Sequence, residues 1–189
     1  MIRIGILGDI GSGKSYVAKS FGYPVFNADN HVSNLYKKDK KIFNKLKQIL
    51  PKYVTKFPIN KIEISNAILD NNLNLKKIIK IVHFEIRKKM KFFLEKNKHR
   101  KFVILDIPLL LENKIDKKDD ILIFIYSRKS DILKRLKKRK NFNKNIYNNF
   151  KKLQLPLDYK KKRSNFMIRN DFKKTSIRKQ IKNILKSII

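Results

Sequence analysis

The chain has 189 residues, a length that suits one domain with a real hydrophobic core rather than two independent domains. Its 48 Lys and Arg residues against 15 Asp and Glu residues give a formal net charge of +33. The lysines are spread along the whole chain among many Asn and Ile residues, as an A/T-rich genome would produce, whereas a nucleic-acid-binding patch concentrates its cations. We therefore expect no nucleic-acid partner. The absence of cysteine excludes disulfides, thiolate metal sites and cysteine nucleophiles.

The chain carries no sequence signal for a membrane or for export. A predicted strand begins at the second residue, where a signal peptide would have a charged and then an apolar segment. No apolar run approaches the roughly 18 residues that a membrane span needs. We expect a cytoplasmic protein with no membrane partner, and we expect it to be a monomer.

The first predicted element, a strand over residues 2–7, leads into a glycine-rich segment. Residues 8–15 read G-D-I-G-S-G-K-S, and a helix is predicted over 16–21. Glycine leaves room for a run of backbone N–H groups to wrap a polyphosphate, and the strand-loop-helix order is the context that such a phosphate-binding loop (P-loop) requires. Lys14 would reach the β- and γ-phosphates, and the Ser15 hydroxyl would ligate Mg²⁺. The residues expected to hold the nucleotide are Gly11, Ser12, Gly13, Lys14, Ser15 and Tyr16.

The remaining elements alternate between strands and helices. Further strands are predicted over residues 24–26, 102–106, 121–126 and 166–169. Helices are predicted over residues 30–37, 130–139, 150–162 and 175–188, with a mostly helical stretch from 40 to 97. This order predicts an α/β fold with a doubly wound parallel sheet.

We interpret residues 1–189 as a single domain with two additions to its core. The core covers residues 1–39 and 98–189, and residues 40–97 form a helical insertion beside the sheet that could hold an acceptor substrate. Residues 134–152 are rich in Lys and Asn, which is compatible with disorder. Their aromatic residues favour a mobile, structured lid instead, which we extend to residues 134–162.

Two carboxylates follow predicted strands and so lie where a ligand would sit. Asp29 comes just after the second strand, beside the phosphate loop, where it could accept a proton from an acceptor hydroxyl or could instead cap the next helix. Asp106 ends the third strand, where it could hold the water shell of Mg²⁺, bind the acceptor, or serve the turn that Pro108 introduces. Position alone leaves these alternatives open.

Three basic residues are further candidates. Arg135 and Arg139 lie four residues apart on one face of a predicted helix, so both could reach a phosphate, although a solvated basic face is the commoner explanation. His83 lies among apolar residues of a long helix, where a histidine is more often a packed residue than a catalyst.

Taken together, these segments resemble the dephospho-coenzyme A kinase family over nearly the whole chain. The phosphate loop is shared by many kinases, whereas the D-I-P-L-L-L-E segment at residues 106–112 is much more specific. The Asn-Ala-Asp at residues 27–29 and His83 occur in the family's order and spacing. Toward the C-terminus the resemblance rests on Arg135, Arg139, Gln154, Lys160, Ile168 and Asn170.

The resemblance implies a P-loop kinase that moves the γ-phosphoryl of ATP to the ribose 3′-hydroxyl of dephospho-coenzyme A, the last step of coenzyme A synthesis, with Mg²⁺. It implies Asp29 as the base, with Lys14 and Arg139 neutralising charge on the transferred phosphoryl. The acceptor residues that it implies are His83, Asp106, Pro108, Leu109, Leu110 and Glu112.

Four positions depart from the family's usual pattern: Tyr16 for threonine, Asn27 for aspartate, Phe84 for proline and Lys140 for aspartate. None removes a group that the chemistry needs, but acceptor affinity is the property they affect most. Two other functions remain open. One is a small P-loop kinase for a nucleoside monophosphate or a metabolite alcohol. The other, supported by charge alone, is a nucleic-acid-binding P-loop NTPase.

Overall fold

A computed structural model describes residues 1–138 and 142–188 of the protein. The chain divides into two compact units. The sheet unit comprises Met1–Asn27, Asn97–Asn143 and Phe150–Ile189, and the helical unit comprises Ala28–Lys96 and Lys144–Asn149. The helical unit begins at Ala28, earlier than the residue 40 at which the predicted insertion begins.

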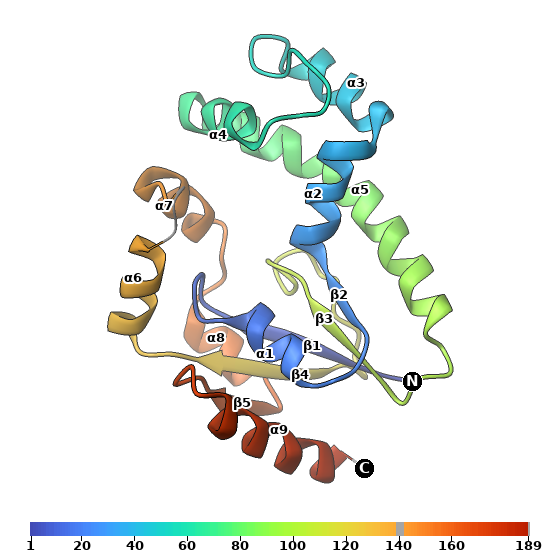
Figure 1. The fold of residues 1–189 in the computed structure, drawn as a ribbon, viewed down its shortest axis with the longest axis vertical. Coiled ribbons are helices and arrows are strands. Elements are labelled where there is room, and N and C mark those ends of the chain that lie inside the picture. Colours follow the sequence, from blue (N-terminus) through green and yellow to red (C-terminus); the bar gives the residue numbers. More distant parts are fainter. Residues whose placement is uncertain (139–141, 189) are drawn as a thin grey trace. The chain divides into compact units, whose positions relative to one another are not determined.

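The sheet unit is built on parallel strands in the order β2-β3-β1-β4-β5 (Figure 1). Their bounds are β1 (Ile2–Gly8), β2 (Val25–Asn27), β3 (Phe102–Asp106), β4 (Ile121–Tyr126) and β5 (Phe166–Arg169). The central strands consist mainly of buried apolar residues because both faces of a parallel sheet are covered. The predicted parallel α/β sheet is confirmed, with β1 and β2 each ending one residue later than predicted. The carboxyl ends of all the strands meet at one edge.

One face of the sheet is covered by α1 (Lys14–Ser20) and α9 (Lys174–Ile188), which the contacts of the core place together. Alternate residues of the strands point to these helices, as the period of a strand requires. This core consists of Ile4, Ile6, Val17, Ala18, Phe21, Phe102, Ile104, Ile123, Ile125, Ile168, Ile177, Ile181 and Ile184. This core packs α1 against the sheet and so fixes the position of residues 8–13, which lead into α1.

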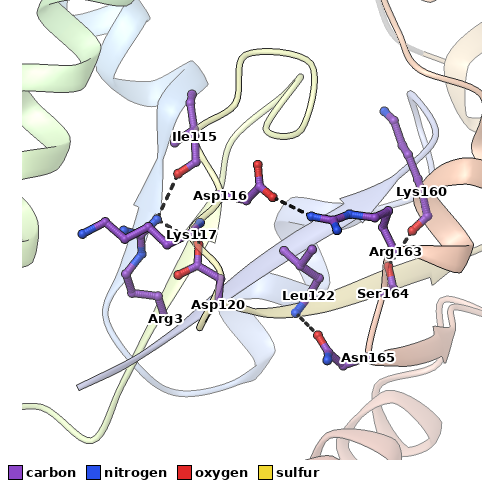
Figure 2. Close-up of polar contacts among 10 residues, drawn as sticks. All are labelled: Arg3, Ile115, Asp116, Lys117, Asp120, Leu122, Lys160, Arg163, Ser164 and Asn165. Atoms are coloured by element: carbon purple, nitrogen blue, oxygen red, sulfur yellow. Dashed lines mark hydrogen bonds and ion pairs between the residues drawn. The ribbon is translucent and has the colours of Figure 1, made fainter.

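A buried ion pair fixes the loop between β3 and β4 to the first strand (Figure 2). The Arg3 guanidinium donates to Asp120 Oδ2 at 2.9 Å and to the Ile115 carbonyl oxygen at 3.1 Å. The Lys117 backbone N–H also donates to Asp120 Oδ2, at 2.9 Å. Burial raises the pKa of Asp120, and the hydrogen bond from Lys117 and the charge of Arg3 oppose that rise. The pairing compensates for removing two charges from water.

The helical unit contains α2 (Ala28–Lys38), α3 (Lys40–Ile49), α4 (Lys61–Asp70) and α5 (Asn72–Lys96). Side-chain caps set two of the helix starts: Asp39 accepts from the Ile42 N–H at 3.0 Å, and Asn60 accepts from the Ile62 N–H at 2.9 Å. The helices bury one apolar face each, as their spacing predicts. The buried side chains include Leu35, Ile42, Leu46, Ile64, Ala67, Ile68, Leu75, Ile78, Val82 and Ile86.

The segment predicted as a lid contains the C-terminal part of α6 (Lys129–Lys137) and all of α7 (Lys144–Lys152) and α8 (Leu157–Lys162). The alternative of disorder is therefore wrong for the described part of this segment. The single helix predicted over residues 150–162 is also wrong, because α7 ends at Lys152 and α8 begins only after Pro156. Proline has no N–H to donate and disfavours helical backbone in the residue before it, so it begins a new helix here.

Candidate nucleotide-binding site

The loop between β1 and α1 has the backbone of a phosphate-binding loop. Gly11 and Gly13 adopt positive φ angles of 85° and 86°, in the region that glycine occupies without strain. The Ser12 N–H donates to the Asp9 carbonyl at 3.2 Å, which closes a turn within the loop. The N–H groups of Tyr16 and Val17 donate to the Gly13 carbonyl at 3.0 and 3.1 Å and begin α1.

The loop's glycines also leave room for the protein itself. A Cβ atom at Gly8 would lie 2.7 Å from the Ile125 carbonyl oxygen, and one at Gly11 would lie 3.0 Å from Ile132 Cγ2. A Cβ atom at Gly13 would overlap the Asn170 side-chain nitrogen. The space beside these glycines, which the sequence led us to expect for the phosphates, is occupied by atoms of β4, α6 and Asn170.

Lys14 and Ser15 begin α1 directly after the loop. Lys14 Nζ donates to the carbonyl oxygens of Gly8 at 3.1 Å and Asp9 at 2.8 Å, which holds the ammonium group against the loop. The two carbonyl groups are polar partners that a bound phosphate could replace. Tyr16, which follows, is exposed.

Ser15, Asn27 and Asp106 meet at the edge of the sheet, from α1, β2 and β3 respectively. Asn27 Nδ2 donates to Ser15 Oγ at 3.5 Å and also donates to Asp106 Oδ2. Asp106 is 3% exposed and is the last residue of its strand. A hydroxyl and a carboxylate side by side form the oxygen donor set that suits Mg²⁺. Among the described residues, no group of three or more His, Asp or Glu side chains is arranged to hold a metal by itself.

Two residues for which the sequence predicted no role donate hydrogen bonds to the backbone of the loop. Ser127 directly follows β4 and Asn170 directly follows β5. Ser127 Oγ donates to the Ser12 carbonyl oxygen at 2.9 Å, and Asn170 Nδ2 donates to the same oxygen at 2.7 Å. The sequence predicted that both residues follow strands, but it did not predict that both would bind the Ser12 carbonyl oxygen.

The turn after β3 separates the predicted acceptor residues into two groups. Pro108 is exposed, and Leu109 has a φ of 58°, with its carbonyl oxygen accepting from Asn113 Nδ2 at 2.8 Å. Leu110 is 1% exposed and packs over Gly5. Positive φ is uncommon for a bulky residue, so the Leu109 backbone is held by its surroundings.

Glu112 closes that turn through a buried ion pair. Its Oε1 accepts from Lys160 Nζ at 2.6 Å and from the Leu155 N–H at 2.9 Å. Both side chains are almost fully buried. The side chains of Leu110 and Glu112 therefore support the turn, and their assignment as substrate-binding residues stays a prediction.

Asp29 and His83 belong to the helical unit. Because α2 begins at Ala28, Asp29 lies inside the first turn and not at the capping position before it, so the capping alternative is wrong. His83 is half-buried on α5, and burial, followed by the charge of Arg87, lowers its pKa below 6.5.

Of the two predicted lid arginines, Arg135 is described. Its guanidinium carbon lies 4.1 Å from the centre of the Phe172 ring, a cation–π contact. Arg139, with residues 140 and 141, lies outside the described residues, so its role stays a prediction. Within residues 1–138 and 142–188, none of the helices has the length and apolar composition for crossing a bilayer.

Comparison with known proteins identifies the family. The family model for dephospho-CoA kinase matches residues 2–176. The dephospho-CoA kinases of Wolbachia sp. subsp. Brugia malayi and Rickettsia typhi are 34% and 32% identical to this chain, over 98% and 100% of it and 97% and 98% of their own lengths. This chain belongs to the dephospho-CoA kinase family. It is therefore a kinase, and ATP use follows from the family. The resemblance predicted from the motifs is confirmed.

Solved structures support the fold of this family member. TT1252 from Thermus thermophilus matches with a TM-score of 0.76 at 23% identity, over 100% of this chain and 98% of that one. The dephospho-CoA kinase from Campylobacter jejuni matches with a TM-score of 0.64 at 20% identity, over 98% and 96% of the two chains. At these identities the likeness establishes the α/β kinase fold.

Proposed function

We propose that this chain transfers the γ-phosphoryl of ATP to the ribose 3′-hydroxyl of dephospho-CoA, giving coenzyme A and ADP. The observation that carries the proposal is the match of the dephospho-CoA kinase family along nearly the whole chain, which includes the specific segment at residues 106–112. The loop geometry supports the nucleotide half of the reaction.

The nucleotide's phosphates bind to the backbone N–H groups of residues 11–16 and to Lys14. The ammonium group is already held against the loop by the Gly8 and Asp9 carbonyls. It exchanges these partners for the β- and γ-phosphates and offsets the charge that spreads over the transferred phosphoryl. Arg139 adds a second positive charge there, and residues 134–162 act as the lid.

Ser15 and Asp106 are the residues that would hold Mg²⁺. Their hydroxyl and carboxylate oxygens fit a hard cation that keeps several of its waters. When bound, the ion neutralises charge on the β- and γ-phosphates. The hydrogen bonds of Asn27 to both side chains support their pre-arrangement.

At the acceptor, Asp29 orients the ribose 3′-hydroxyl and takes its proton. The hydroxyl oxygen forms a bond to the γ-phosphorus while the bond from that phosphorus to the bridging β–γ oxygen breaks, and ADP leaves. Pro108, Leu109 and His83 contact the acceptor. We also propose that the protein acts as a single-domain monomer.

The test is ADP release from purified protein with Mg-ATP, with dephospho-CoA, AMP, shikimate, single-stranded RNA or no acceptor added. Release that depends on dephospho-CoA is expected. Lys14→Ala should abolish it, whereas Lys19→Ala, which removes a cation from the last turn of the same helix, should not. Release driven by AMP or shikimate would indicate a different small kinase, and release with RNA or without acceptor would indicate an NTPase.

A further inference from the structure

We infer that Ser127 and Asn170 are positioning residues that lock the Ser12–Gly13 peptide of the phosphate loop in its phosphate-binding orientation. This inference deepens the proposed function and rests on it, because it concerns how the same loop receives ATP. Neither residue is proposed to touch the reacting atoms.

The two side chains converge on one buried carbonyl oxygen. Ser12 O accepts from Ser127 Oγ at 2.9 Å and from Asn170 Nδ2 at 2.7 Å, so both of its lone pairs are used. Ser12, Ser127 and Asn170 are 0%, 7% and 2% exposed. Because the site is buried, water cannot readily replace these hydrogen bonds, and losing one costs free energy.

Holding this carbonyl decides where the next N–H points. The peptide group is planar and trans, so the Ser12 C=O and the Gly13 N–H point in opposite directions. With the carbonyl bound to Ser127 and Asn170, the Gly13 N–H faces away from β4 and β5. A flipped peptide would turn the carbonyl oxygen to that side, where it would repel a phosphate.

The loop needs such a lock because of its glycines. Gly11 and Gly13 flank Ser12, and glycine gives the backbone access to both signs of φ, which makes a peptide flip easy. Gly13 also makes the lock possible, since any side chain there would overlap Asn170 Nδ2.

Asn170 is itself held on both sides of its amide. Its Oδ1 accepts from the Phe172 N–H at 2.9 Å, so Nδ2 must face Ser12. Its backbone N–H donates to the Tyr126 carbonyl at 2.8 Å, which ties it to the end of β4. Ser127 Oγ lies 3.2 Å from the Asn170 carbonyl oxygen and 2.9 Å from the Ser12 carbonyl oxygen, so the Ser12 carbonyl is the nearer acceptor for its one proton.

Two donors on one acceptor predict a specific pattern in variants. Ser127→Ala and Asn170→Ser each leave Ser12 O with one donor, and a serine at 170 keeps an oxygen near the Phe172 N–H but is too short to reach Ser12. Each single variant should weaken ATP binding about 3- to 10-fold. The double variant, which leaves the buried carbonyl without either bond, should weaken it on the order of several hundred-fold, more than the product of the single effects.

The matched control is Asn165→Ser, because Asn165 makes a comparable bond at the other end of the same strands (Figure 2). Its Oδ1 accepts from the Leu122 N–H of β4 at 2.8 Å, far along the strand from the loop. This variant should lower thermal stability while leaving ATP affinity as in the wild type. A merely structural role of Ser127 and Asn170 would give the same result as this control.

The experiment is calorimetric titration of each folded variant with Mg-ATP in the absence of acceptor, followed by steady-state KM values for ATP and dephospho-CoA. A raised Kd and KM for ATP with an unchanged KM for dephospho-CoA is expected. Single variants that bind ATP as the Asn165→Ser control does would overturn the inference, as would a loss confined to the acceptor's KM. A wild type that binds ATP without phosphorylating dephospho-CoA would refute the proposed function and leave the lock to be judged by the titrations.

Discussion

At the end of β2, the Asn27 amide nitrogen donates to both Ser15 and Asp106. The family resemblance implies aspartate at this position, and an aspartate would put a second carboxylate against Asp106 in place of a neutral donor. This chain therefore has one negative charge fewer at the proposed Mg²⁺ site. The change affects how strongly the site attracts a cation, and the oxygen ligands themselves stay in place.

Asn27→Asp should lower the free Mg²⁺ concentration that gives half-maximal turnover about 3- to 10-fold, since cation affinity rises with the number of charged oxygen ligands. Initial rates at fixed ATP across a Mg²⁺ series measure this. Asn183→Asp, on the exposed side of α9, makes the same change of charge away from the loop and should have no effect. An unchanged or higher Mg²⁺ requirement in Asn27→Asp would contradict the assignment of Ser15 and Asp106.

Asp29→Asn should lower kcat by a factor of about 10² to 10⁴, the range that a positioned general base contributes. Circular dichroism should show an unchanged fold, because Asp29 lies in the first turn of α2 and outside the core. Asp39→Asn is the control: it removes the same charge from the same unit, and asparagine replaces aspartate well at a helix N-cap. Near-normal turnover in Asp29→Asn would exclude it as the base.

His83 contributes a pH dependence to stability. Its folded pKa is lowered by burial and by Arg87, so the folded state favours the neutral imidazole. The stability that this provides is complete above pH about 6.5 and is lost as the pH falls through the lowered folded pKa. Urea unfolding at pH 7.5 and 5.5 should therefore show a smaller loss in His83→Gln than in the wild type. Part of the stability loss at low pH should remain in His83→Gln, because burial and the charge of Lys89 lower the pKa of His31 as well. The exposed His99→Gln should match the wild type, and an equal loss in His83→Gln would be contrary to this account.

Among the elements, the strands were predictable to within a residue because each is a short, mainly apolar run rich in β-branched and aromatic residues. The division between α7 and α8 was missed although Pro156 marks it, since the helical spacing of apolar residues continues across the break. The lock on Ser12 could not be predicted, because only the order of β1, β4 and β5 brings Ser127 and Asn170 to the loop. The loop's local sequence was enough to predict Lys14 and Ser15.

The turn after β3 shows how a motif residue can serve structure. Glu112 lies in the segment most specific to the family, which predicted contact with the acceptor. Its partner Lys160 stands on α8, close to β1, and nothing in the local sequence links the two. The ion pair fixes the end of the turn to α8, the last helix of the predicted lid.

Lys160→Met should destabilise the protein by about 3–5 kcal/mol, the cost of leaving one partner of a buried ion pair uncompensated. Lys161→Met, an exposed neighbour on the same helix, should change the free energy of unfolding little. Adding Glu112→Gln to Lys160→Met should recover part of the loss, because the buried charge is then removed. Urea unfolding of the four proteins at pH 7.5 measures these values. A loss below about 1 kcal/mol in Lys160→Met would mean that the pair does not hold the turn.

At the scale of the whole molecule, the sheet unit contains the nucleotide loop and the helical unit contains Asp29 and His83. The order of motifs along the chain predicted both sets of residues without the fold. The +33 charge, which alone supported a nucleic-acid function, belongs to a chain whose family accounts for the phosphate loop and the D-I-P-L-L-L-E segment together. The proposed function therefore depends on showing which acceptor the protein phosphorylates.

The most direct test is to locate the new phosphate on the product. Dephospho-CoA is incubated with Mg-ATP and the protein, the product is purified, and the coupling of its phosphorus to the ribose protons is measured by NMR. The account predicts phosphate on the ribose 3′-oxygen and one ADP for each molecule of product. Phosphate at another position, or ADP formed without a phosphorylated acceptor, would contradict it.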